Sequence, residues 1–318
     1  MENTSFTART DLYQAVTDKI ISALESGVTP WKCPWQSANR NIADYFPRNG
    51  LSHRFYSGVN VLLLWLAARD NGYQSPGWLT FRQANEAGGN VRKGERASLA
   101  IFFKPYKTVK KNGAGIPVLN EQGEPVMEER TVIKHMPLFN IEQCENLPET
   151  LNGSHSPTTT TLPVAEHNTP EILALVNALG IPLQHRPQNR AFYRPATDTI
   201  TLPMPDQFVS TRDYQATLLH ELTHATGHQQ RLAREGIVRK SGRFGDPAYA
   251  FEELIAEIGS AFLLANFNIS GEVQHASYIN GWLKVLKEDK HAIFRACRQA
   301  REACDFLLNM QINQQRVA

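Results

Sequence analysis

Apolar side chains recur every three or four positions over residues 11–26, and this spacing predicts an amphipathic helix. The stripe consists of Leu12, Val16, Ile20, Ala23 and Leu24. Gly27 follows at the position where helices favour a C-terminal glycine cap, so the helix is expected to end there. A second helix is predicted near Gly58–Asn71, and the Ser-Pro-Gly sequence at residues 75–77 predicts a turn after it.

Two later stretches, Ala97–Tyr106 and Glu128–Leu138, have the composition of β-strands. The residues between them, Lys110–Glu124, contain the sequences NGAG and QGE, which predict a hairpin or loop. Helices followed by strands indicate that this part of the chain forms an α+β domain.

Residues 148–170 are rich in Ser, Thr, Pro and Asn and hold few large apolar side chains. Such a segment buries too little apolar surface to offset the entropy lost on ordering, so we predict an interdomain linker. A chain of 318 residues, 42% of them apolar, is long enough for two globular domains. We therefore predict a first domain over residues 1–147 and a second over residues 171–318.

The second domain is predicted to begin with a helix over Glu171–Leu179 and a hairpin over Phe192–Leu202, where polar and apolar residues alternate. Ser210, with an acidic residue three positions later, has the character of a capping box and predicts a helix start. A further helix is expected after Asp246 and Pro247, because aspartate caps helices and proline suits the first helical position. These two longer helices carry the candidate chemistry.

The first of these helices contains His220, Glu221 and His224 in the pattern HExxH. Residues four positions apart share a helix face, so both imidazoles can reach one metal ion. Glu221 is offset by one residue and can act as general base on a water at the ion. The pattern is short enough to occur by chance, but flanking leucines would bury one side of the helix. The sequence therefore predicts a metallopeptidase-type site.

The third metal ligand lies outside this motif. The extended pattern HExxHxxGxxH is disfavoured, because Gln230 stands where its last histidine is needed. His228 could coordinate only if the chain folded back just after Gly227. Glu253, on the helix after Asp246, lies opposite the main apolar stripe and is the favoured third ligand; Glu252 takes this role if the helix phase differs.

Glu257 lies one turn beyond Glu253 and is predicted to accept a hydrogen bond from a ligand imidazole, which would fix its tautomer. Two imidazoles and a carboxylate favour Zn²⁺, while Mn²⁺ or another first-row divalent ion would fit the same donors.

Basic charge is concentrated early in the chain: residues 1–111 hold fifteen Lys and Arg against eight Asp and Glu, whereas residues 151–318 hold sixteen of each kind. Between residues 92 and 111, cations alternate with aromatic residues, as on surfaces where cations follow phosphates and rings stack on single-stranded bases. The predicted nucleic-acid contacts are Trp31, Trp35, Tyr56, Trp78, Arg92, Lys93, Arg96, Lys104 and Lys107. The competing interpretation is a solvated strand edge, with the tryptophans in the core.

The four cysteines form no CxxC pair, and the amino terminus has no basic-then-apolar leader. The longest apolar run, Val59–Ala68, is shorter than the roughly 20 residues that span a bilayer. We therefore expect a cytoplasmic protein without a disulfide framework or membrane insertion.

Several blocks of sequence resemble the ArdC-type antirestriction family, whose first domain also occurs joined to plasmid TraC-type primases. In the first half these blocks are TPWKCPW, FYSGVNVLLLWLAA, GWLTFRQANEAGGNVRKGERA and PLFNIEQCENLP. In the second half they are AFYRPATDTITLP, YQATLLHELTHATGHQQRL and YAFEELIAEIGSAFL. The resemblance covers nearly the whole chain apart from the linker and the tail after about Asn268, and the family's metal motif falls on His220, Glu221, His224 and Glu253.

The resemblance implies an α+β protein of mobile elements such as conjugative plasmids, with a single-stranded-DNA-binding domain followed by a zincin-like, gluzincin-type metallopeptidase domain. It implies that the protein shields incoming DNA from host restriction, and it leaves open whether the peptidase is active. We expect DNA to bring the site near protein substrates such as restriction or DNA-processing proteins, with the linker supplying reach. The alternative is a protein that occludes single-stranded DNA and has a structural or inactive metal site. A metal-dependent nuclease is less well supported, because such sites cluster carboxylates around two ions.

Overall fold

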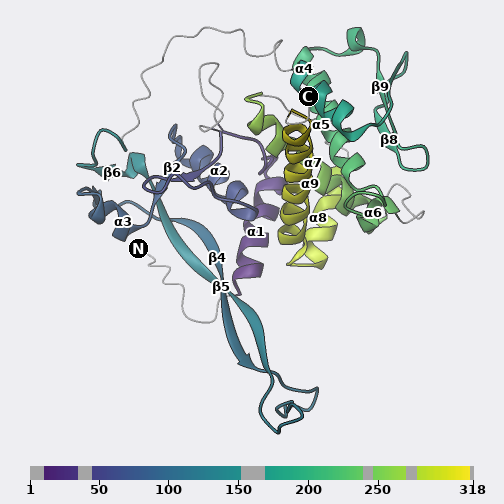
Figure 1. The fold of residues 1–318 in the computed structure, drawn as a ribbon. Coiled ribbons are helices and arrows are strands. Elements are labelled where there is room, and N and C mark those ends of the chain that lie inside the picture. The colour runs from purple at the N-terminus through teal and green to yellow at the C-terminus, as the bar shows by residue number, and fades with distance from the viewer. Residues whose placement is uncertain (1–10, 35–44, 152–168, 239–245, 270–277, 316–318) are drawn as a thin grey trace.

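The computed structural model describes residues 11–34, 45–151, 169–238, 246–269 and 278–315. The first part, to residue 151, combines helices with a sheet, and the later part is mainly helical with one small sheet (Figure 1). Within these described residues, no helix has the length and apolar character needed to cross a bilayer.

The helices of the first part begin and end where the sequence predicts. Asp11 caps α1 (Leu12–Glu25) by accepting hydrogen bonds from the backbone of Tyr13 and Gln14, and the left-handed Gly27 follows its end. Helix α2 (Val59–Asn71) is buried over most of its length and ends at the left-handed Gly72. A short helix that the sequence analysis did not identify, α3 (Phe81–Glu86), follows β2.

The main sheet has the order β1-β2-β5-β4. Its strands are β1 (Arg48–Asn49), β2 (Gly77–Leu79), β4 (Ser98–Val109) and β5 (Met127–Asn140), and a two-residue ladder joins β3 (Asn90–Val91) to β6 (Cys144–Glu145). Strands β4 and β5 pair antiparallel from Ser98 and Leu138 to Val109 and Met127, and they project from the body of the molecule (Figure 1). We call β4, β5 and the connecting residues 110–126 the arm. Both strands are longer than predicted by a few residues.

The second part contains a three-stranded sheet of order β7-β9-β8 and a group of packed helices. The elements are α4 (Thr169–Leu179), β7 (Leu183–Arg186), β8 (Phe192–Arg194), β9 (Thr199–Pro203), α5 (Thr211–Thr226), α6 (Glu235–Val238), α7 (Pro247–Asn266), α8 (Ile279–Glu288) and α9 (Ala292–Gln315). The predicted hairpin is present as the antiparallel pair β8 and β9.

Helix α9, which the sequence analysis did not predict, lies at the centre of this group (Figure 1). It packs against α7, α4, α5 and α2. Its buried stripe consists largely of small side chains, namely Ala292, Ile293, Ala296, Cys297, Ala300, Ala303, Cys304 and Leu307. Small residues allow close contacts between helices. In the sequence, however, they give only a weak apolar periodicity among charged residues, which is why the pattern did not predict this helix.

The two parts share one continuous apolar core. Trp31 of the first part packs edge-on against Trp282 of α8, with ring centroids 5.2 Å apart. Phe46 and Trp65 contact Phe262 of α7, with ring centroids 6.0 and 6.1 Å apart. The described residues of the two parts are therefore held together by packing. The greater part of the predicted linker, residues 152–168, lies outside the described residues.

Candidate metal centre and nucleic-acid surface

Local features place α5 and its HExxH motif. The hydroxyl of Ser210 caps the helix by accepting a hydrogen bond from the backbone of Asp213, as predicted. The helix ends before Gly227, whose φ of −76° any residue can adopt. A Cβ at this position would lie 2.7 Å from Ile237 and 2.9 Å from Arg234. Glycine suits this position because Arg234 and Ile237 pack against the end of the helix, and not because the backbone is left-handed.

Helices α5 and α7 approach closely because small residues lie between them. A Cβ on Gly259 would lie only 2.6 Å from Thr223, and the Ser260 hydroxyl donates a hydrogen bond to the carbonyl of Ala216 at 3.2 Å. This contact fixes the register of the two helices. It brings Glu253 opposite the two histidines of the motif.

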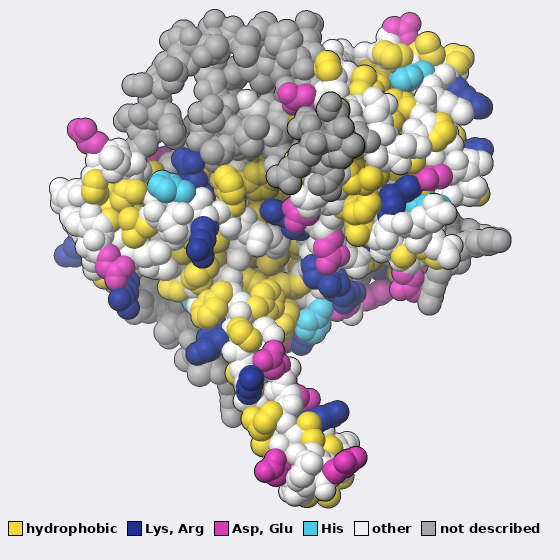
Figure 2. All heavy atoms as spheres, in the orientation of Figure 1, with side chains coloured by type: hydrophobic (Ala, Val, Ile, Leu, Met, Phe, Trp, Pro, Cys, Tyr) yellow, Lys and Arg dark blue, Asp and Glu magenta, His cyan; other side chains and the backbone are white. Residues whose placement is uncertain are grey.

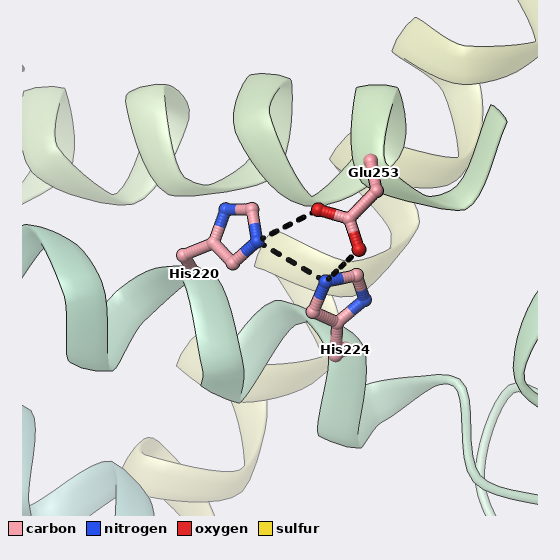
Figure 3. A group of neighbouring side chains, drawn as sticks. All are labelled: His220, His224 and Glu253. Atoms are coloured by element: carbon pink, nitrogen blue, oxygen red, sulfur yellow. Dashed lines mark hydrogen bonds and ion pairs between the residues drawn. The ribbon is translucent and has the colours of Figure 1, made fainter. Parts of the chain in front are cut away.

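His220, His224 and Glu253 converge on one point between the two helices (Figure 3). The two Nε2 atoms are 3.1 Å apart, and each lies 3.5 Å from an oxygen of the Glu253 carboxylate. All three residues are buried, with exposed fractions of 3%, 7% and 6%. Within the described residues they are the group whose ligand atoms lie close enough together to hold a metal ion.

These separations fit a single first-row divalent ion. Ligands about 2.0–2.1 Å from a tetrahedral ion lie about 3.3 Å from one another. The observed separations of 3.1, 3.5 and 3.5 Å bracket that value. Two imidazoles and one carboxylate are also the donor set that such ions take in hydrolytic sites, so the residues present suit the group.

A buried network holds the second nitrogen of His224. Its Nδ1 lies 3.2 Å from Glu252 Oε1, and Arg234 donates hydrogen bonds to the same carboxylate, the shortest at 2.7 Å. Arg234 also donates to the Thr226 hydroxyl and the Thr223 carbonyl, both at 2.6 Å. Glu252 therefore faces away from the convergence point and orients His224, instead of serving as the alternative ligand considered from the sequence.

Glu257 lies on the corresponding side of the other histidine. Its Oε1 is 3.7 Å from His220 Nδ1, and both side chains are almost fully buried. Glu257 therefore lies beside a ligand imidazole, as predicted, but this distance is slightly longer than that of a hydrogen bond. Each imidazole thus has a carboxylate near the nitrogen that points away from Glu253.

Charges in this cluster stabilise one another. Burial by itself would lower the pKa of His224, but Glu253 and Glu252 outweigh it and raise this pKa to about 10. Burial would likewise raise the pKa of Glu253, yet His224 and His220 hold it well below its ordinary range. Arg234 and His224 hold the pKa of Glu252 down against the same opposing effect. The carboxylates beside His224 therefore favour its protonated form.

The convergence point opens into a cavity of about 600 Å³. Glu221 lines it beside the two histidines, together with the phenol rings of Tyr249 and Tyr278. The apolar part of its lining comes from β8, the residues beside β8, and α6: Ala191, Phe192, Pro195, Ala196, Ile237 and Val238. His228 also lines the cavity but is not part of the converging group.

The predicted nucleic-acid contacts lie partly in the core and partly at the surface. Trp31 and Trp78 are core residues, with exposed fractions of 3% and 0%, so neither ring offers a face to a base. These two predicted contacts are corrected, because the rings fill the apolar core. Tyr56 is half-buried against the same core, and Trp35 lies outside the described residues.

The predicted basic contacts lie at the surface in two places. Arg92, Lys93 and Arg96 follow β3, where Arg92 pairs with Glu95 at 2.7 Å. Lys104 and Lys107 lie on β4 and are exposed. Because successive strand residues alternate between faces, these two lysines point to opposite sides of the arm.

One face of the arm alternates aromatic and basic residues. Cross-strand pairs join Phe102 to Lys134, Lys104 to Val132 and Tyr106 to Arg130. We call these six residues the aromatic–basic face. Phe102, Tyr106 and Val132 are 40%, 43% and 38% exposed, which is unusual for large apolar side chains in a row. Figure 2 shows hydrophobic side chains interspersed with charged ones along the projecting arm.

The other face of the arm is partly covered near its base. Phe103 packs against Tyr13 of α1 and Phe294 of α9, with ring centroids 6.5 and 6.4 Å apart. Further out on this side, Lys107 lies 3.9 Å from Glu129. Phe103 is nevertheless 48% exposed, so α1 and α9 cover this face only in part. The aromatic–basic face differs from it by alternating its apolar side chains with Lys and Arg on both strands.

Comparison with known proteins decides the family. The N-terminal domain of anti-restriction factor ArdC matches residues 10–139, and a zincin-like metallopeptidase family matches residues 170–299. The metal-free crystal structure of antirestriction protein ArdC from plasmid R388 is 38% identical, with a TM-score of 0.74 over 96% of this chain and 99% of that chain. The chain belongs to the ArdC antirestriction family. The predicted two-domain α+β architecture is confirmed with it.

Further matches include proteins of similar length and two much longer ones. The Mn(II)-bound structure of R388 ArdC is 37% identical, with a TM-score of 0.70 over 96% of this chain and 99% of that one. The uncharacterized protein y4eC of Sinorhizobium fredii is 37% identical over 96% of this chain and 94% of its own length. Two Escherichia coli proteins named DNA primase TraC are 35% and 36% identical over 95% of this chain, which spans only 20% and 27% of their lengths.

Some residues of the cavity were not found from the sequence. Arg234 gave no signal, because its partner Glu252 lies 18 positions away. Tyr249 could have been found, since it lies one turn before Glu253 and shares its helix face. Tyr278 reaches the cavity only through the packing of α8, which no local pattern indicates.

Proposed function

We propose that this ArdC-family protein protects the incoming DNA of a mobile element from host restriction, that it binds single-stranded DNA on the arm, and that it hydrolyses peptide bonds at a divalent-metal site. The observation that supports the hydrolytic part is the convergence of His220, His224 and Glu253 beside Glu221 in an open cavity.

His220, His224 and Glu253 would hold the metal, with Zn²⁺ favoured by the donor set and Mn²⁺ an alternative suggested by the Mn(II)-bound R388 ArdC. When bound, the cation supplies a Lewis acid that polarises a carbonyl and acidifies water. Glu221 would take a proton from the attacking water and return it to the leaving amine. Glu252 and Arg234 would keep His224 in a fixed orientation throughout.

The test of the hydrolytic part is Glu221→Gln, which keeps the shape of the side chain but removes the base. We expect metal content to stay at the wild-type level, peptide hydrolysis to fall by about 10²–10⁴-fold, and protection against restriction to be lost. Glu302→Gln, at an exposed site on α9, serves as the control. Unchanged protection in Glu221→Gln with metal still bound would instead support a protein that occludes DNA and has a structural metal site.

The DNA-binding part is supported by the aromatic–basic face of the arm. Rings that stack on bases and cations that neutralise phosphates at alternating positions suit a single strand without requiring sequence-specific contacts. The acidic residue that offsets this charge is Glu128, which pairs with Arg130 at 2.6 Å. Lys104 and Lys134 then carry the basic charge of this face.

Lys104 and Lys107 provide a matched test, because they are exposed lysines three positions apart on opposite faces of one strand. We expect Lys104→Ala to weaken binding of an oligothymidine and to reduce the salt dependence of the affinity by about 0.7 of a unit in the log–log slope. Lys107→Ala should change neither quantity. Equal effects of the two substitutions would show that the bound strand does not follow this face.

A further inference from the structure

Two tyrosines face each other at the rim of the metal cavity. Tyr249 lies on α7 one turn before Glu253, and Tyr278 lies just before α8. Their hydroxyl oxygens are 3.0 Å apart, and both rings line the cavity that holds His220 and Glu221. A phenol inside a polar cavity supplies a hydrogen-bond donor without adding a charge.

Both phenols are affected by the carboxylates of the site. Tyr249 interacts with the carboxylate of Glu253, while Tyr278 lies in the field of both Glu253 and Glu221. A peptide carbonyl bound beside Glu221 would enter the cavity that the Tyr278 ring also lines.

Packing holds Tyr278 in this position. Its ring stacks on Trp282, with centroids 6.2 Å apart, and Trp282 in turn packs edge-on against the buried Trp31. Tyr249 fixes the hydroxyl end through its own hydroxyl. A donor that is oriented before the reaction stabilises developing charge without the cost of reorganisation.

We propose that the Tyr278 hydroxyl donates a hydrogen bond to the scissile carbonyl oxygen, with Tyr249 as its positioning residue; this rests on the proposed peptidase function. As the water oxygen bonds to the carbonyl carbon, a water proton moves to Glu221 and the carbonyl π pair moves onto the oxygen that Tyr278 faces. That pair then re-forms the C=O bond, the C–N bond breaks, and Glu221 returns the proton to the nitrogen. The products are one carboxylic acid and one amine.

The test compares the metal-loaded full chain with its Tyr278→Phe, Tyr249→Phe and Tyr214→Phe variants. Tyr278→Phe removes one oxygen and keeps the ring on Trp282. Tyr214 is the matched control, because its hydroxyl lies 3.1 Å from His185 in the same half of the chain and does not line the cavity. The probe is a phosphinic peptide with apolar side chains on both sides of the phosphinate, and its affinity is measured by calorimetry together with metal content.

We expect Tyr278→Phe to bind the phosphinic peptide about 100-fold more weakly at unchanged metal content, and to lower kcat by about 10²–10³-fold with little change in KM. Tyr249→Phe should weaken binding about tenfold, and Tyr214→Phe should match the wild type. Wild-type affinity in Tyr278→Phe, or a loss explained by lost metal, overturns the assignment while the peptidase function stands. A wild-type protein that neither hydrolyses peptides nor binds the probe overturns both.

Discussion

The metal cavity and the arm differ in whether their functional side chains are buried or exposed. In the cavity the charged groups are buried, and several lie against partners from another element, as Glu252 lies against Arg234. On the arm, Phe102 and Tyr106 are large rings left in solvent. A buried polar group costs free energy unless it is paired, whereas an exposed one costs little. The charged groups of the cavity therefore need their buried partners to be stable, whereas the exposed side chains of the arm are not needed for the stability of the fold.

This difference predicts where substitutions act on stability and where they act on binding. A change around the cavity should disturb folding and metal binding together. A change on the arm should alter nucleic-acid binding while the fold is unaffected. The predictions below test that division.

The largest effect is expected for Arg234→Ala. It leaves Glu252 buried without its cation, which should lower the free energy of unfolding by about 3–5 kcal/mol. Lys107→Ala breaks an ion pair whose partners are more than 70% exposed, and should change stability by less than about 1 kcal/mol. Urea unfolding of both variants measures the contrast. Similar small losses in both would show that the network around His224 is not a buried ionic cluster.

A smaller effect, confined to binding, is expected for Tyr106→Ala on the arm. Loss of a stacking ring should weaken single-stranded DNA binding by about 1–3 kcal/mol. Because the ring is exposed, the thermal unfolding temperature should stay within a degree or two of wild type. Fluorescence titration with an oligothymidine gives the affinity. A marked fall in unfolding temperature would place this ring in the core rather than on a binding face.

The last prediction concerns pH, and its effect is the smallest when it is counted per pH unit. The pKa of His224 is raised from 6.5 to about 10, so the metal-free fold gains stability from this proton that is full below pH 6.5 and is lost as the pH rises through 10. Metal must displace the same proton, so its affinity should rise about tenfold per pH unit between pH 7 and 10, or about 1.4 kcal/mol. Calorimetry in buffers of different ionisation enthalpy should detect the released proton. Affinity independent of pH over this range would contradict the charge state described for the cavity.

The sequence predicted the parts of the site that local spacing determines. Helical periodicity placed His220 and His224 on one face of α5, and the face of α7 opposite its apolar stripe made Glu253 the favoured third ligand, with Glu252 as the alternative. The role of Glu252 was not predictable in the same way, since it depends on Arg234, which lies just before α6 and 18 positions away in the sequence. Contacts between elements are decided by tertiary packing, which a single sequence does not encode in any short pattern.

The aromatic residues also show that the sequence did not distinguish core from surface positions. Composition grouped Trp31 and Trp78 with Tyr106 and Lys104, although the first two fill the core and the others lie on the arm. Tryptophan is amphipathic, so its presence beside basic residues does not decide between core and surface. The strand positions were correctly predicted, but the exposed face became visible only with the cross-strand register.

The central claim is that His220, His224 and Glu253 grip one divalent ion, and a crystal structure of the protein soaked with Zn²⁺ or Mn²⁺ tests it most directly. We predict one ion bound by the Nε2 atoms of both histidines and by the Glu253 carboxylate, with His224 Nδ1 still on Glu252. An ion bound elsewhere, or a soaked crystal with no ion between α5 and α7, would contradict the account.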